Sequence, residues 1–138
     1  MLRRRRLAAL TRPALGAAGV GPFGEKKGER KDAMLKIYTT VIEMIGMLGA
    51  AMGQIESHDR DLARQLRRAS GSIALNVAEG SGSRGGTRRE RYQNALGSAR
   101  ETVACLDVAE ALGYVGRLDA GVRDRLDFIC GTLVKNVR

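Results

Sequence analysis

Arginine is the residue type with the clearest chemical potential in this chain, because its guanidinium group presents a planar fork of donors that suits phosphate. Residues 60–91 contain eight arginines, no lysine and three acidic residues. The first four lie on the side of a predicted helix opposite its apolar positions, where a ligand can reach them. The alternative is a solvated face, or salt bridges between subunits. The predicted phosphate-contacting residues are Arg64, Arg67, Arg68, Arg84, Arg88, Arg89 and Arg91.

A glycine- and serine-rich segment, residues 80–85, separates two groups of these arginines and reads G-S-G-S-R-G. This spelling matches the dinucleotide-binding pattern G-x-G-x-x-G, but that pattern follows a β-strand inside a βαβ unit. A helical pattern precedes the segment here, so the dinucleotide interpretation fails. The segment leads into a predicted helix start, where free amides attract anions. We therefore expect a weak phosphate contact at this turn.

Residues that commonly perform catalysis are scarce in the sequence. His58 is the single histidine and lies in a predicted link, which gives a Ser-His-Asp arrangement little support. Cys105 and Cys130 lie among apolar neighbours, as unreactive core thiols do. The sequence lacks the E-x-x-H pairs of a di-iron bundle. We expect no enzymatic activity, no metal and no cofactor; an enzymatic alternative would use Glu79 and Glu101 as an acid–base pair.

Asn76 is expected to point into the protein, because it continues the heptad spacing of Ala69 and Ile73. A buried amide is costly unless it is hydrogen-bonded. Nearby Glu79 lies in a last helical turn, where the helix dipole disfavours negative charge. These two unfavourable choices predict a structural polar network, with Arg84 and loop amides as further candidate partners. The predicted members of the network are Asn76, Glu79, Ser98 and Glu101.

Four amphipathic helices must position these residues. Apolar residues recur at steps of three and four over residues 33–55, 60–79, 88–112 and 120–137, which is typical of helices with one buried face. No stretch alternates as a strand would. Helices of similar length joined by short links favour an all-α, up-and-down antiparallel four-helix bundle.

Residues at the helix ends support these boundaries. Asp59 and Asp119 can accept hydrogen bonds from the free amides that open the second and fourth helices. Thr87 begins a T-x-x-E capping box at the start of the third helix. Gly80 and Gly113 follow the second and third helices, where a left-handed residue commonly ends a helix.

Several glycines are expected inside helices, although each costs roughly 1 kcal/mol relative to alanine there. Gly46, Gly49 and Gly53 lie on one stripe of the first predicted helix. The stripe predicts a close approach by another helix, within the bundle or from a second subunit. Gly97 and Gly131 are interpreted in the same way, and tolerated glycine is the alternative.

The first 32 residues differ from the rest, because they hold nine basic and three acidic residues and both prolines. They predict a basic, flexible arm at residues 1–32 and a helical domain at residues 33–138. A processed segment and an over-long start assignment are alternatives. An export signal is disfavoured, since the apolar run after the first arginines is short and interrupted.

The sequence also indicates where the protein works. The longest uncharged run of the first helix, residues 44–55, has 12 residues, whereas a membrane span needs about 20. Two cysteines do not form a disulfide framework, so we expect a cytoplasmic protein without a membrane partner.

Several motifs between residues 61 and 114 occur in combination. They are Q-L-R-R-A at 65–69, N-V-A-E-G at 76–80, A-L-G-S-A-R-E at 95–101 and L-G-Y at 112–114. In this order they resemble a bacterial family of proteins, first noticed as reading frames in intervening sequences of 23S ribosomal RNA genes. The likeness extends loosely over residues 34–137 and leaves out the basic arm. Leu75, where the family often has a small residue, is a modest departure.

The resemblance implies a four-helix protomer that assembles into a ring-like homo-oligomer, which is a pentamer in the family. It also implies a relation to the accessory protein of diversity-generating retroelements, which binds nucleic acid and a reverse transcriptase. Members are not known as enzymes.

Residues and resemblance together favour a non-enzymatic homo-oligomer that binds RNA or DNA through arginine–phosphate contacts, as an accessory factor. The alternative is a protein–protein adaptor or scaffold, for example a reverse transcriptase accessory subunit, with no nucleic-acid binding of its own.

Overall fold

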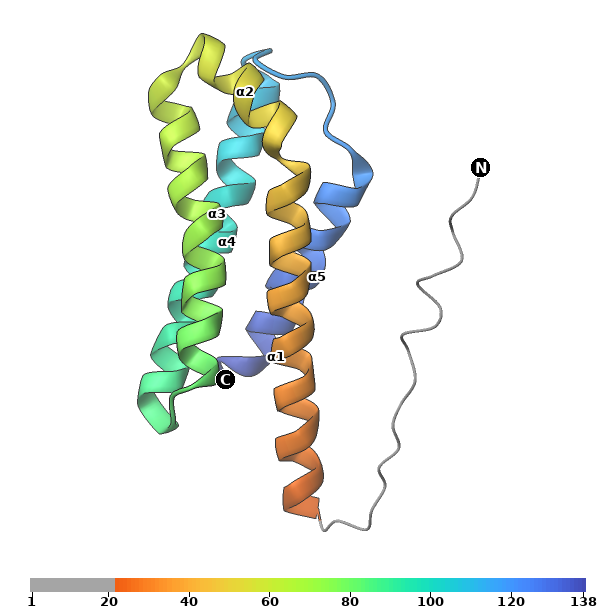
Figure 1. The fold of residues 1–138 in the computed structure, drawn as a ribbon, viewed down its shortest axis with the longest axis vertical. Coiled ribbons are helices and arrows are strands. Elements are labelled where there is room, and N and C mark those ends of the chain that lie inside the picture. The colour runs from red at the N-terminus through yellow and green to blue at the C-terminus, as the bar shows by residue number, and fades with distance from the viewer. Residues whose placement is uncertain (1–21) are drawn as a thin grey trace, which may run out of the picture.

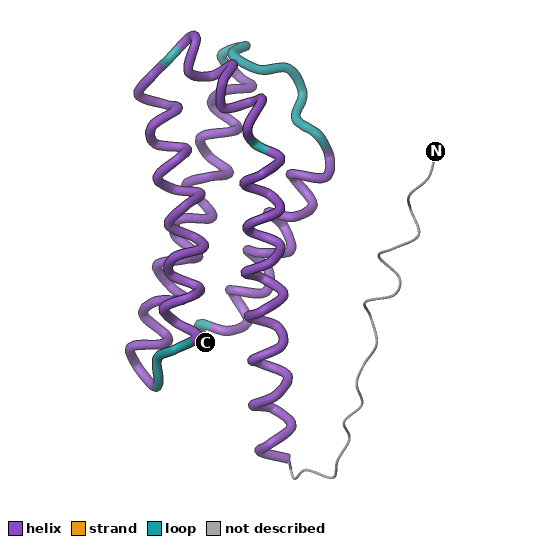
Figure 2. Tube along the Cα trace, in the orientation of Figure 1, coloured by secondary structure: helices purple, strands orange, loops and turns teal. Residues whose placement is uncertain are grey.

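The computed structural model describes the backbone of residues 22–138 and the side chains from residue 31 onward (Figure 1). Most of the predicted basic arm therefore lies outside the described residues. Helices are the only regular elements in the described range, which contains no strand and confirms the all-α class (Figure 2). The elements are α1 (Pro22–Met47), α2 (Gly49–His58), α3 (Arg60–Ser81), α4 (Gly85–Ala111) and α5 (Ala120–Asn136).

The helices α1, α3, α4 and α5 lie side by side and alternate in direction along the chain (Figure 1). α3 packs along α4, α5 packs against both α1 and α4, and α1 contacts α3. Their apolar faces meet in one buried cluster that includes Leu66, Leu106 and Ile129. The predicted spacing of apolar residues therefore places the right faces inward, since burial of these stripes drives helix packing.

The first helical segment divides into two helices, although the sequence predicted a continuous helix over residues 33–55. α1 ends at Met47, α2 begins at Gly49, and the two are bent by 51°. The buried Leu48 lies at the break, and its N–H donates to the carbonyls of Met44 and Ile45 at 3.1 Å. Glycines on both sides weaken the helix here, and the bend brings α2 against α3.

The start of α1 also differs from the prediction. The helix begins at Pro22 rather than at residue 33, so the predicted boundary between arm and domain falls inside α1. Proline is compatible with a first helical position, because its missing N–H would have no helical partner there. In the described part of the chain no single helix is long and apolar enough to cross a membrane; α1 and α2 reach that composition only as a bent pair.

Two of the predicted helix caps are confirmed. The Asp59 carboxylate accepts a hydrogen bond from the Leu62 N–H at 2.9 Å, which opens α3. The Asp119 carboxylate accepts one from the Gly121 N–H at 2.8 Å, which opens α5. Both aspartates thus satisfy amides that the helix itself leaves free.

Gly113 ends α4 as predicted. Its φ of 74° lies in the left-handed region, which glycine adopts without a steric penalty. The Gly113 N–H donates to the Glu110 carbonyl at 3.0 Å, and the Tyr114 N–H donates to the Ala109 carbonyl at 2.9 Å. This pair of hydrogen bonds is the Schellman arrangement.

Two other predicted helix ends are wrong. α4 begins at Gly85 with Arg84 at the cap position and no side-chain cap, so Thr87 lies within the first turn and forms no capping box. Gly80 lies inside α3, which continues to Ser81. A Cβ atom at Gly80 would lie 2.6 Å from Cδ1 of Tyr92. Glycine is needed at position 80 for space, not for a left-handed backbone.

The glycine stripe of the first helical segment meets no neighbouring helix among the described residues. Cβ atoms built at Gly46, Gly49 and Gly53 find no other described atom within 4 Å, and the same holds for Gly97 and Gly131. The described residues therefore supply no close approach at these glycines. A contact with a second subunit stays a prediction.

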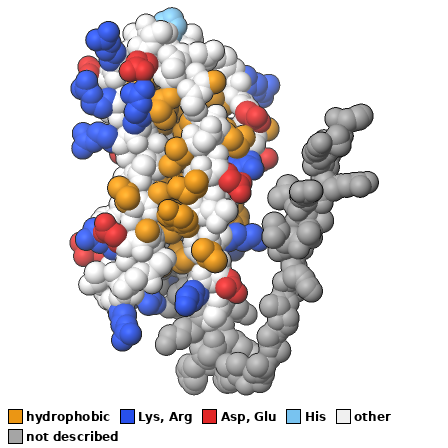
Figure 3. Space-filling view, in the orientation of Figure 1, with side chains coloured by type: hydrophobic (Ala, Val, Ile, Leu, Met, Phe, Trp, Pro, Cys, Tyr) orange, Lys and Arg blue, Asp and Glu red, His pale blue; other side chains and the backbone are white. Residues whose placement is uncertain are grey.

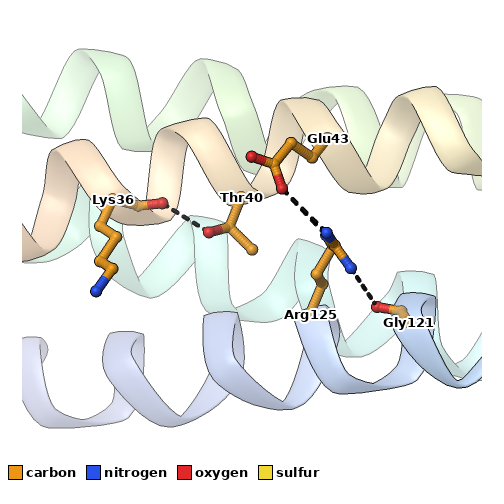
Figure 4. A network of polar contacts seen from close by, with 5 residues as sticks. All are labelled: Lys36, Thr40, Glu43, Gly121 and Arg125. Atoms are coloured by element: carbon orange, nitrogen blue, oxygen red, sulfur yellow. Dashed lines mark hydrogen bonds and ion pairs between the residues drawn. The ribbon is translucent and has the colours of Figure 1, made fainter. Parts of the chain in front are cut away.

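Polar contacts fasten α5 to its neighbours. The Arg125 guanidinium donates to the Glu43 carboxylate of α1 at 3.2 Å and to the Gly121 carbonyl at 3.1 Å (Figure 4). On α1 itself, the Thr40 hydroxyl donates to the Lys36 carbonyl at 2.8 Å (Figure 4). The contact between Arg125 and Glu43 crosses from the last helix to the first, which are far apart in sequence.

A second ion-pair group joins α4 to α5. The Arg123 guanidinium lies 2.8 Å from the Asp107 carboxylate and 2.7 Å from that of Glu110. The hydrogen bond from Arg123 is the main reason that the pKa of Glu110 is lower than usual. Glu110 also accepts a hydrogen bond from the Leu118 N–H at 3.4 Å, so it holds the α4–α5 link.

Candidate nucleic-acid interface

The seven predicted arginines fall into two groups. The upper arginine group lies in the first half of α3, and the turn arginine group lies at the α3–α4 turn and the start of α4. Because a helix rises 1.5 Å per residue, the groups are separated by about 20 Å along α3. Figure 3 shows Lys and Arg side chains gathered near both ends of this face. The upper group is Arg64, Arg67 and Arg68; the turn group is Arg84, Arg88, Arg89 and Arg91.

Three of these arginines form ion pairs with carboxylates of the same chain. All three pairs are exposed to solvent, and such pairs contribute at most about 1 kcal/mol. A phosphate group can therefore replace the carboxylate at little cost. The pairs are Arg64–Asp61 at 3.4 Å, Arg67–Glu56 at 2.9 Å and Arg91–Glu79 at 3.1 Å.

The strongest of these exposed contacts involves Arg67. Its hydrogen bond, and then its charge, lowers the pKa of Glu56, so this carboxylate stays ionised at neutral pH. In contrast, Arg68, Arg84 and Arg89 are exposed and have no carboxylate partner among the described residues. These three arginines present free donors to solvent.

Arg88 has a different position from the other arginines. Its Nε donates to the Ser83 carbonyl at 2.9 Å, and its side chain is half-buried. Arg88 therefore folds back over the α3–α4 turn and holds it in place. Gly85 allows the turn to reverse, because its φ of 58° is left-handed.

The predicted polar network is only partly assembled. The Asn76 amide donates to the carbonyl and hydroxyl oxygens of Ser72 at 2.9 and 3.0 Å. The Ser98 hydroxyl of α4 also donates to the Ser72 hydroxyl, at 2.9 Å. Ser72 thus joins Asn76 to Ser98, and the sequence analysis did not predict it. Its position four residues before Asn76, on the same face of the helix, could have indicated this contact. Glu79 pairs instead with Arg91, and Glu101 lies exposed on α4.

The side chains considered for catalysis include His58, Cys105 and Cys130, and each of them packs against other parts of the protein. The His58 ring stacks on Tyr114 with ring centres 5.1 Å apart and planes within 5°, which joins α2 to the α4–α5 link. Burial raises the pKa of the Cys105 and Cys130 thiols, so both remain protonated at neutral pH. No group of three or more metal-ligating side chains comes together in the described residues.

An open groove of about 930 Å³ lies between α1 and the α3–α4 turn. We call it the turn groove. α1 contributes five residues between positions 31 and 38, and α3 contributes Ala78 and Ser81. The turn and the start of α4 contribute residues 82–85, Arg88 and Tyr92. Sequence reasoning missed this groove, because it combines distant segments, although the glycine- and serine-rich segment 80–85 pointed to one of its walls.

The turn groove combines positive charge with aromatic surface. Lys31, Arg84 and Arg88 line it against one acidic residue, Asp32. Tyr38 from α1 and Tyr92 from α4 add two of the three tyrosines in the chain. A basic groove with aromatic walls is suited to an anion that carries a flat ring.

The family comparison covers both arginine groups. The profile of the family described as 23S rRNA-intervening sequence protein matches residues 33–125, which include α3, α4 and the turn between them. No curated protein and no solved structure matches the chain. The match extends over more than half of the sequence and includes the motifs of the α3–α4 region. The chain therefore belongs to the family of 23S rRNA-intervening sequence proteins.

Proposed function

We propose that this protein is a non-enzymatic, homo-oligomeric accessory factor that binds the backbone of RNA or DNA in the cytoplasm. The observation that carries the proposal is the set of three exposed arginines without carboxylate partners among the described residues, Arg68, Arg84 and Arg89. Guanidinium groups bind phosphate oxygens in a bidentate manner. The exposed ion pairs of the other arginines add groups that can exchange a carboxylate for a phosphate.

Backbone contacts are expected to outweigh base contacts. One group of arginines lies on α3 and the other lies at the α3–α4 turn and the start of α4, so a strand can pass from one to the other without any base being read. Phosphate contacts give affinity that is independent of sequence and falls with added salt.

We further propose that the protomer is an up-and-down four-helix bundle in which α2 is a bent continuation of α1, and that copies form a ring. Two separate exposed apolar surfaces support this assembly. The front surface consists of Ile42 on α1 and Leu75 on α3, and the back surface consists of Val108 on α4 and Leu112 directly after it. A ring needs two such different surfaces, because each copy contacts its neighbours head to tail. The family resemblance favours five copies.

A protein–protein adaptor is the second candidate function, for example an accessory subunit of a reverse transcriptase. The observation that favours it is the front surface itself, since Leu75 is 66% exposed and Ile42 is 47% exposed. Figure 3 shows hydrophobic side chains along the middle of this face. Contiguous exposed apolar surface commonly marks a protein contact.

The deciding experiment compares two triple variants with equal charge changes. The test variant carries Arg68→Glu, Arg84→Glu and Arg89→Glu, none of which breaks an ion pair among the described residues. The control variant carries Arg100→Glu, Arg117→Glu and Arg138→Glu, which are exposed elsewhere. Fluorescence anisotropy with labelled RNA and DNA is measured over a range of salt concentrations.

We expect wild-type affinity to fall with salt at a log–log slope of about −0.7 to −0.9 per phosphate contact. The test variant should bind at least tenfold more weakly with a shallower slope, and the control should lose less. Equal losses in both variants would mean that net charge, not this site, drives binding. Absence of wild-type binding would reject the proposal in favour of the adaptor.

A further inference from the structure

The turn groove has one end that is suited to an anion. Lys31, Arg84 and Arg88 outnumber Asp32 among its charged lining residues. The start of α4 lies at the same end, and its cap residue Arg84 makes no side-chain hydrogen bond to the free amides. Unsatisfied amides and the positive end of the helix dipole both favour a bound phosphate.

After Lys31 and Asp32, the wall contributed by α1 is apolar and aromatic. Tyr38 is 39% exposed and Leu35 is 66% exposed, although both are large side chains of a kind usually buried. Both line the groove, together with the buried Met34. A flat base can cover such surface by stacking on the tyrosine ring.

Tyr92 gives a second, independent indication of a ligand. Its side chain is 98% buried, with only 2% exposed, yet its hydroxyl has no hydrogen-bond partner among the described residues. Tyr92 lines the turn groove, and its hydroxyl is not among fully buried polar atoms without a partner, of which the described part of the chain has none. A nearly buried hydroxyl that opens into a groove can bond a polar group of a ligand.

We propose that the turn groove binds one nucleotide of a single-stranded nucleic acid, with its phosphate at Arg84 and Arg88 and its base against Tyr38. The groove volume of about 930 Å³ lies within the range of small-molecule sites. A base can reach the α1 wall only if it is unpaired, so the groove selects a single strand over a duplex.

This inference rests on the proposed nucleic-acid function and adds to it a base contact and a preference for single strands. An acidic protein segment is the competing occupant. It would satisfy the arginines, but it would leave the exposed Tyr38 ring without a flat partner. The combination of cations and an exposed ring therefore favours a nucleotide.

The experiment uses the full chain and two fluorescein-labelled probes of equal length, an oligouridylate and an abasic oligomer with the same number of phosphates. Tyr38→Ala is the first test variant. Phe128→Ala is its matched control, because Phe128 is also aromatic and 38% exposed but lies outside the groove. Tyr92→Phe is the second test variant, which removes the hydroxyl and keeps the ring. Sedimentation of each variant checks that assembly is unchanged.

We expect Tyr38→Ala to weaken oligouridylate binding about tenfold, the equivalent of one lost base stack, and to leave abasic binding unchanged. Tyr92→Phe should weaken oligouridylate binding by a smaller factor, and Phe128→Ala should have no effect. Wild-type protein should bind the single strand more tightly than a duplex with the same number of phosphates.

Other outcomes are equally informative. If wild-type protein binds neither probe, the proposed function fails as a whole. If it binds both probes equally and Tyr38→Ala changes neither, only the nucleotide site is overturned. If a polyglutamate peptide binds and only its binding depends on Tyr38, the groove is a site for an acidic protein segment. If uridine monophosphate binds as tightly as the oligouridylate, the groove is a site for free nucleotides.

Discussion

Tyr92 owes its position to a missing side chain on α3. Gly80 is buried, and its lack of a Cβ allows the tyrosine ring to lie directly against the backbone of α3. The same ring then lines the turn groove. A single small residue therefore determines both the packing between α3 and α4 and the shape of the candidate site.

We expect Gly80→Ala to destabilise the protein by about 1–3 kcal/mol, because the added methyl group must displace Tyr92. Gly71→Ala is the matched control, since it lies in the same helix with no neighbour within 4 Å of its Cβ position. That control should raise stability by about 0.5–1 kcal/mol, as alanine favours helix over glycine. Urea unfolding followed by circular dichroism measures both; equal effects would contradict the close contact.

The sequence identified Gly80 as an important position but gave the wrong reason for it. A glycine after an apolar helical stretch commonly supplies a left-handed end, and only the neighbouring helix reveals that space is what matters. The arginines were likewise identified by type, while their separation into two groups depends on the length and direction of α3.

The bounds of the helices agree closely with those predicted from the sequence where burial of apolar residues determines them. α3, α4 and α5 cover the predicted apolar stretches to within a few residues at each end. The break at Leu48 was missed because apolar spacing continues across it, and the bend is set by packing of α2 on α3. Groove formation was also missed, since periodicity within one helix contains no information on which helices are neighbours.

Substitutions of capping residues test how the helix ends are stabilised. Asp59→Ala should destabilise the protein by about 1 kcal/mol, because it removes the acceptor for the Leu62 N–H. Thr87→Ala should change stability little, since Thr87 lies within α4 and caps nothing. Thermal unfolding compares the two variants. A larger loss for Thr87→Ala would restore the capping box that the sequence predicted.

The whole molecule presents apolar residues on two sides. The front surface lies on α1 and α3, and the back surface lies on α4 and directly after it; α4 runs behind α3 in Figure 1. The glycines of the first helical segment lie open to solvent, which would let a neighbouring helix come close to α1. These features together favour a closed ring over a symmetric dimer.

Mixing two variants separates these assemblies. Ile42→Glu with Leu75→Glu blocks the front surface, and Val108→Glu with Leu112→Glu blocks the back surface; all four positions are exposed. Each variant alone should sediment as a monomer of 14.9 kDa. Their mixture should form a one-to-one dimer, because one intact front can still meet one intact back. Gln93→Glu serves as a control that should retain the wild-type mass.

The turn groove lies at the end of the protomer where α3 passes into α4, while the His58–Tyr114 stack lies at the opposite end. Identical copies arranged around one axis would present all their grooves on the same rim. A strand long enough to reach adjacent grooves would then bind by avidity, since the first engagement raises the local concentration for the next. Affinity would depend on strand length in steps set by the spacing between copies.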